Sequence, residues 1–121
     1  DPLKTLSKLS QFLAKDGFIL VSLPNVAYFY IRLKLLIGQF DYQERGIMDK
    51  SHLRFFTLKT AKRLVVDAGF AIQSIYVTVP NVPISFGSNK FFNIIYKLAY
   101  WAAKDWKTMF AFQFIIIGKR T

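Results

Sequence analysis

The sequence predicts an α/β fold in which three β-strands form one sheet flanked by helices. Three segments show the β-branched and aromatic character of strands, namely Phe18–Leu23, Phe70–Val79 and Met109–Ile117. Between them lie stretches whose apolar residues recur at helical spacing. The chain has 121 residues, a length that suits one small domain, so we expect residues 1–121 to belong to a single unit.

The first helix and the first strand have clear local signals. Asp1-Pro2 suits a helix start, with aspartate as N-cap and proline at the first position. One face of this helix is marked by Leu3, Leu6, Leu9, Phe12 and Leu13. After Gly17, the unbroken apolar run Phe18–Leu23 is typical of a parallel strand buried on both faces. Pro24-Asn25 ends that strand.

Helices and a loop are predicted for the middle of the chain. Val26–Ile37 has helical character, whereas Gln39–Ser51 is polar and is predicted to be a loop. Thr57 is placed to cap a helix over Leu58–Ala68, and Gly69 is placed to stop it. The inner face of this helix is expected to hold Leu58, Ala61, Leu64, Val65 and Ala68.

The last third of the chain predicts strand, helix and strand. Turn residues at Pro80–Pro83 and Gly87 separate Phe70–Val79 from a helix over Asn89–Lys104. In Met109–Ile117, alternate positions place four residues on one face, namely Phe110, Phe112, Phe114 and Ile116. The first two strands are joined through helices and should be parallel, whereas the last two can form an antiparallel pair. The apolar first strand should be covered by a neighbouring strand or by a second copy of the chain.

Composition excludes several kinds of site. The chain has no cysteine and one histidine, which excludes disulfides, thiolate metal sites and histidine-rich metal sites. Seventeen Lys and Arg against seven Asp and Glu give a net charge of +10, which attracts anions such as lipid head groups or phosphorylated substrates. No nucleic-acid-binding signature is present, so nucleic acid is not an expected partner. Neither a signal peptide nor a spanning helix is expected, and a cytoplasmic location, with membrane association as the alternative, is predicted.

The densest group of functional side chains lies in Asp49–Thr57. His52, the only histidine, can act as a general base because its ordinary pKa is near neutral, or it can be a structural residue that pins the loop. Arg54 can clamp a phosphate or carboxylate through its planar guanidinium group, or it can form an ion pair with Asp49.

Further candidates lie on either side of this block. Asn25 follows the first strand, at the end where ligands gather in open α/β sheets. It can contact substrate there, or it can cap the following helix. Asp41, Tyr42 and Arg45 can form part of a lid over an acceptor molecule, and a solvated loop is the alternative.

The order of these segments resembles the C-terminal half of class I S-adenosylmethionine-dependent methyltransferases. Leu3–Lys15 and Phe18–Asn25 resemble the helix before the fifth strand and that strand with its Pro-Asn end. The block His52–Thr57, followed by Leu64–Phe70, resembles the approach to the next helix and the helix itself. The last two predicted strands resemble the sixth and seventh strands of the family. Residues 80–108 are an insertion, predicted to be helical, that has no counterpart in this resemblance.

The resemblance implies a partial Rossmann-like methyltransferase sheet of three strands, the last one antiparallel. It further implies methyl transfer to a small-molecule or glycan acceptor, with S-adenosylmethionine as cofactor of the full-length protein. His52 is then the candidate base, and the candidate substrate-binding residues are Asn25, Arg54, Tyr42 and Arg45. The family's glycine-rich loop and its acidic ribose-binding residue have no counterpart in this sequence. We therefore expect the fragment to bind no cofactor, to be inactive alone and to form homo-oligomers.

A second hypothesis is a non-catalytic basic module. Tyr28–Ile37 and Phe91–Trp101 combine apolar residues with lysine or arginine, as helices on anionic membranes do. Such a module would bind a membrane surface or a partner protein. The same helices can instead form a substrate lid packed on the core, or a surface for self-association.

Overall fold

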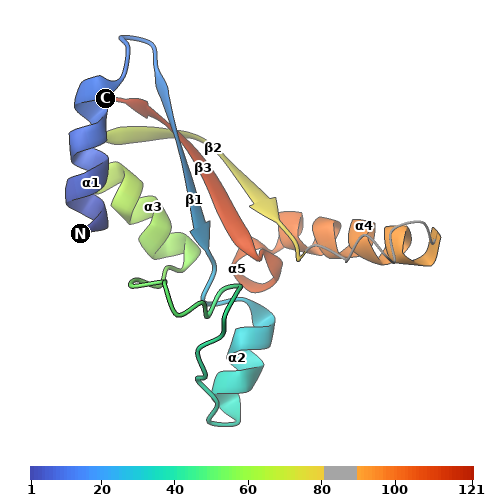
Figure 1. The fold of residues 1–121 in the computed structure, drawn as a ribbon. Coiled ribbons are helices and arrows are strands. Elements are labelled where there is room, and N and C mark those ends of the chain that lie inside the picture. Colours follow the sequence, from blue (N-terminus) through green and yellow to red (C-terminus); the bar gives the residue numbers. More distant parts are fainter. Residues whose placement is uncertain (81–89) are drawn as a thin grey trace.

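The computed structural model describes residues 1–80 and 90–121, and in them an open three-stranded sheet is flanked by helices (Figure 1). The α/β class predicted from the sequence is therefore confirmed. The elements, in chain order, are α1 (Pro2–Leu9), a 3-10 helix (Ser10–Phe12), β1 (Phe18–Pro24), α2 (Phe29–Leu36), α3 (Leu58–Asp67), β2 (Phe70–Thr78), α4 (Lys90–Asp105), α5 (Lys107–Phe110) and β3 (Gln113–Arg120).

The strands have the order β1-β3-β2, and β3 is antiparallel to both of its neighbours. The predicted antiparallel pairing of the last two strands is confirmed. β1 and β2 run in the same direction, but β3 lies between them. The prediction that β1 is a parallel strand buried on both faces is wrong, because β1 pairs antiparallel with β3 and is an edge strand of the described sheet. Its exposed and buried positions alternate over Phe18–Ser22, as in an antiparallel sheet with one covered face.

One face of the sheet is covered by α1 and α3, which lie together on the same side in Figure 1. Residues of this face belong to the main core, and they include Ile19, Val21, Val77, Phe114 and Ile116. Phe114 and Ile116 share a face, as predicted. Close packing is possible because β3 has Gly118 opposite Val65 of α3. A Cβ atom on Gly118 would lie 3.1 Å from the Cβ of Phe70 and 3.2 Å from the Cγ2 of Ile19.

The helix signals of the sequence are confirmed at α1 and α3. The Asp1 carboxylate accepts a hydrogen bond from the Leu3 amide at 3.0 Å, which caps α1. Thr57 and Thr60 form a reciprocal capping box at the start of α3. Gly69 follows α3 with a φ of +89°, a conformation that glycine adopts without strain. The predicted inner face of α3 packs on the core through Leu58, Ala61, Leu64, Val65 and Ala68.

Several element boundaries differ from prediction, among them the end of β3, which lies at Arg120 rather than Ile117. α2 begins at Phe29 rather than Val26, because the Val26 amide pairs with the Phe56 carbonyl and the chain turns before it becomes helical. β3 begins at Gln113 rather than Met109, because the residues before it form α5. The apolar spacing predicted a first helix that includes Phe12 and Leu13, whereas α1 ends at Leu9. α4 matches the predicted helix closely, whereas the predicted breaks at Asn81–Pro83 and Gly87 and the helix start at Asn89 lie outside the described residues.

The predicted loop, residues 39–51, is part of the longer connection between α2 and α3, and it is anchored by buried side chains. Ile47 and Met48 pack with Ile31 of α2 in a second, smaller core. Backbone hydrogen bonds from Gln43 to Met48 and from Lys50 to Gln43 hold the loop together. This anchoring places the following residues, from Ser51 onward, beside the end of β1.

Candidate functional site

An open cleft of about 640 Å³ lies at the carboxyl end of β1. Three segments that are far apart in the sequence line it, through Asp1, Pro2, Ser22, Leu23, Pro24, Ser51, His52, Leu53 and Arg54. The start of α1, the end of β1 and the segment before α3 therefore meet here. Of the predicted site residues, His52 and Arg54 both line this cleft.

The His52 ring is fixed by a hydrogen bond to the backbone. Its Nδ1 atom lies 3.0 Å from the carbonyl oxygen of Ile47. A carbonyl oxygen can only accept, so Nδ1 carries a proton, and in the neutral form of the ring the lone pair lies on Nε2. The His52 amide donates to the Asp49 carbonyl at 3.0 Å, which fixes the backbone as well. This arrangement pins the loop and leaves Nε2 able to accept a proton, so the two predicted roles of His52 are compatible.

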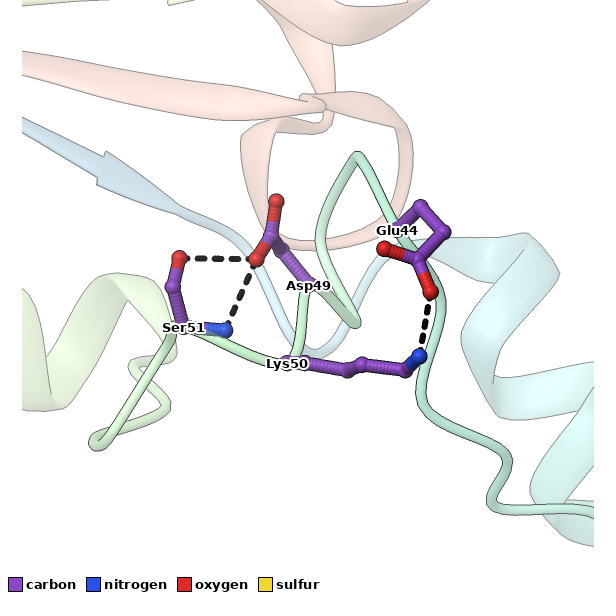
Figure 2. Close-up of polar contacts among 4 residues, drawn as sticks. All are labelled: Glu44, Asp49, Lys50 and Ser51. Carbon is purple, nitrogen blue, oxygen red and sulfur yellow. Dashed lines mark hydrogen bonds and ion pairs between the residues drawn. The ribbon is translucent and has the colours of Figure 1, made fainter.

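Asp49 orders the turn that leads to His52 (Figure 2). One of its carboxylate oxygens accepts from the Ser51 amide at 2.8 Å and from the Ser51 hydroxyl at 2.7 Å. The backbone hydrogen bond, followed by the hydroxyl hydrogen bond, lowers the pKa of the Asp49 carboxyl below its usual value, and the charge of His52 contributes a smaller effect in the same direction. Next to it, Lys50 forms an ion pair with Glu44, and this pair is exposed to solvent.

Arg54 lies on the rim of the cleft and is exposed. The ion pair with Asp49 that the sequence left open is not formed. Within the described residues, no carboxylate lies within ion-pair distance of Arg54, and the Asp49 carboxylate is bound by Ser51 instead. Its guanidinium group is thus available for an anion that enters the cleft.

Asn25 is wholly buried and all its side-chain polar atoms are hydrogen-bonded within the protein. Its Nδ2 atom donates to the carbonyl oxygens of Ala111 at 2.8 Å and Thr108 at 3.2 Å. Its Oδ1 atom accepts from the Ala27 amide at 3.0 Å, which forms the turn that precedes α2. The N-cap position of α2 belongs to Tyr28. Asn25 is therefore part of the scaffold below the cleft.

The remaining candidates lie outside the lining of this cleft. Tyr42 is exposed and its ring contacts those of Phe40 and Phe55, with centroid distances of 5.9 and 6.3 Å. Asp41 and Arg45 are exposed on the same loop. The structure thus brings His52 and Arg54 together and places Tyr42 and Arg45 elsewhere.

Several lining residues were missed by sequence reasoning. Asp1 and Pro2 carried a helix-start signal only, and Ser22 belonged to an apolar strand. Their place in the cleft depends on how α1 packs against α3, which is a long-range contact without a local sequence signal. Ser51 had such a signal, because an aspartate two residues before a serine is typical of a side-chain-stabilised turn.

The described residues contain no cluster of metal-ligating side chains, and no glycine-rich turn of the kind that binds S-adenosylmethionine follows β1. None of the described His, Asp and Glu residues cluster in threes as a metal site requires. The connection that follows β1 begins at the buried Asn25 and has no glycine before Gly38. A glycine-rich turn between a strand and a helix, which such a cofactor requires, is therefore not present in this part of the molecule.

Comparison with models of known protein families gives no match, and comparison with curated protein sequences gives none either. A functional assignment therefore rests on two observations of the structure. These are the cleft that contains His52 and Arg54, and the arrangement of the three strands.

Proposed function

We propose that this chain is the acceptor-binding part of a class I S-adenosylmethionine-dependent methyltransferase that modifies a small-molecule or glycan acceptor. The observation that carries the proposal is the antiparallel strand β3, which lies between β1 and β2. An antiparallel strand among the last three is what the sequence resemblance implies. The open edge of β1 supports the same proposal, because it is where the rest of a larger sheet would pair.

Arg54 and His52 would have different roles in the acceptor cleft. The exposed guanidinium group of Arg54 would bind an anionic group of the acceptor and fix its orientation. The Nε2 atom of His52 would accept the proton of the acceptor hydroxyl or amine, because Nδ1 is bound to the Ile47 carbonyl. Methyl transfer depends mainly on positioning, so the fixed ring and the clamp would be the chain's main contributions. We propose that the isolated chain binds no S-adenosylmethionine and is inactive.

The first test is the binding of an anionic ligand by the 121-residue chain. Titration with inorganic phosphate and with a hexuronic acid, followed by amide chemical shifts in NMR spectra, should perturb residues around His52 and Arg54. The substitution Arg54→Ala should abolish the saturable shifts. Arg63→Ala is the matched control, because Arg63 is also exposed but pairs with Asp67 on α3. Equal binding by both variants would show that Arg54 is not the clamp.

The second test concerns the reaction. A protein extended by the residues encoded before Asp1 should transfer a labelled methyl group from S-adenosylmethionine to an acceptor. In that protein, His52→Ala should lower kcat by about 10²-fold to 10⁴-fold, as expected for loss of a general base. An upstream sequence without a strand and glycine-rich loop would remove the basis of the methyltransferase proposal, whatever the phosphate titration shows.

A further inference from the structure

Helix α4 has two apolar faces, and within residues 1–80 and 90–121 only one of them packs on the core. Ala103 is buried and Ala99 is half-buried, and both pack on the main core. Helix α4 contacts β2 and α5, and Figure 1 shows that it extends away from the sheet. Several large side chains of α4, among them Ile94, Leu98 and Trp101, therefore do not belong to the core formed by the described residues.

The outer face of α4 carries large apolar side chains in one line. Ile94, Leu98 and Trp101 are 57%, 64% and 62% exposed. With about 100° of rotation per residue, these positions fall within an arc of about 60°. The centre of this arc lies about 150° from the direction of Ala99 and Ala103. We call Ile94, Leu98 and Trp101 the outer stripe. Phe91, also exposed, continues the same line one turn earlier.

A column of lysines runs beside the outer stripe. Lys90, Lys97 and Lys104 are spaced by seven residues, which places them on one side of the helix. The centre of the column lies about 70° from the centre of the outer stripe. The Nζ atom of Lys104 lies 5.8 Å from the centroid of the Trp101 ring. The only carboxylate of the helix is Asp105, at its last residue.

We propose that α4 binds the surface of an anionic phospholipid bilayer, with the outer stripe at the level of the upper acyl chains and the lysine column among the head groups. An apolar stripe that contains tryptophan, bordered by lysines, is the pattern of helices that lie in the membrane interface. Within the described residues, no helix is both long and apolar enough to cross a bilayer. The contact is therefore peripheral. This inference goes beyond the proposed function and does not depend on it.

Charge favours a lipid surface over a second copy of the chain. Pairing of two outer stripes would bring two lysine columns together, and their like charges repel. An anionic bilayer complements the lysines and accepts the apolar side chains at once. Each lysine near such a surface strengthens binding by about fivefold.

Vesicle flotation with the 121-residue chain tests the electrostatic half of the proposal. The chain should float with vesicles of phosphatidylcholine and phosphatidylserine but not with phosphatidylcholine alone, and it should be released in about 1 M salt. The double variant K97Q/K104Q should bind about 25-fold more weakly. The control K59Q/K62Q removes the same charge from α3, so its affinity for the vesicles should fall much less. Equal losses in the two variants would refute a local role for α4.

Two further measurements test the apolar half. L98Q should weaken binding at least tenfold, whereas L36Q, at an 82% exposed leucine of α2, should not. In the variant W106F, Trp101 is the only tryptophan, and its emission should shift to the blue and be quenched by brominated acyl chains on binding. Circular dichroism spectra of all variants should match that of the parent, which excludes unfolding as the cause. Absence of quenching in the bound state, or a dimer that is broken by L98Q while no vesicles are bound, would overturn the proposal.

Discussion

Replacement of Asn25 tests whether this residue is scaffold or substrate contact. In the structure its amide group satisfies two carbonyl oxygens, those of Thr108 and Ala111, and its Oδ1 atom satisfies the Ala27 amide. The side chain is wholly buried. Asn25→Ala removes these hydrogen bonds and leaves the partner groups in a place from which water is largely excluded. An alanine also leaves a small cavity.

The size of the effect follows from the number of bonds lost. A neutral hydrogen bond contributes about 0.5–1.5 kcal/mol to stability, and a buried group left without a partner costs about 1–3 kcal/mol. The Thr108 contact is longer and only partly buried, so it adds little. We therefore expect Asn25→Ala to lower the free energy of unfolding by about 2–4 kcal/mol. Asn93→Ala, at an exposed asparagine of α4, should change it by less than about 0.5 kcal/mol.

Urea unfolding followed by circular dichroism measures this difference as a shift of the midpoint with an unchanged slope. Asn25→Asp provides a second measurement, because a carboxylate would face carbonyl oxygens that cannot donate. Its folded-state pKa would be raised above the unfolded value of about 3.9. Stability of this variant should therefore fall as pH rises from about 4 to 7. Loss of less than about 1 kcal/mol in Asn25→Ala, together with lost phosphate binding, would refute the scaffold role.

Two other predictions concern the loop and the edge of the sheet. Hydrogen bonds from Ser51 lower the pKa of Asp49, so the stability that they contribute is present above the unfolded pKa and is lost as pH falls through the lower folded value. Ser51→Ala removes the hydroxyl donor and keeps the amide donor. The pKa of Asp49, measured by NMR titration, should therefore rise part of the way to its usual value. An unchanged pKa would contradict this prediction. The chain should self-associate through β1, whose Leu20 is 64% exposed, and Leu20→Lys should shift sedimentation toward monomer, whereas Leu53→Lys should not. A monomeric parent chain at high concentration would remove this prediction.

Signals that act within a few residues predicted the helices well. The side chains of Asp1 and Thr57 cap helices in the structure because each needs only the amides of the next turn. The stop at Gly69 likewise depends on one backbone angle. The inner face of α3 follows from apolar spacing alone. Such features are local, and no knowledge of the sheet is needed to find them.

Strand pairing was not accessible in the same way. The run Phe18–Leu23 is apolar at almost every position, so its composition indicates burial on both faces, whereas Phe18 and Leu20 are exposed in the described chain. A continuous apolar run does not reveal which strand lies beside it. The position of β3 between β1 and β2 is visible only in the three-dimensional structure. The helix α5 was missed because its last residue, Phe110, continues the alternation of Phe112, Phe114 and Ile116 in the sequence.

The sequence predicted which kinds of residue form the candidate site, but it did not predict which of the candidates come together. His52 and Arg54 were singled out because ionisable side chains are concentrated there, and both line the cleft. Tyr42 and Arg45 were included because they lie in the same loop. In that loop, Ile47 and Met48 pack with Ile31 of α2, and only the residues after them, from Ser51 to Arg54, line the cleft at the end of β1. The sequence signal for this difference was the presence of two hydrophobic residues, Ile47 and Met48, in a polar stretch.

The cleft and the sheet are coupled through the end of β1. The backbone amide of Asn25 donates to the Phe112 carbonyl at 2.9 Å, and the backbone amide of Phe112 donates to the Thr78 carbonyl at 2.8 Å. The residue just before β3 therefore joins the ends of β1 and β2. On the other side, the Val26 amide donates to the Phe56 carbonyl at 3.0 Å, which ties the segment that contains His52 to the same point. Whatever displaces β3 from its place between the two strands must also move the floor of the cleft, so ligand binding at Arg54 should report on the pairing of β3.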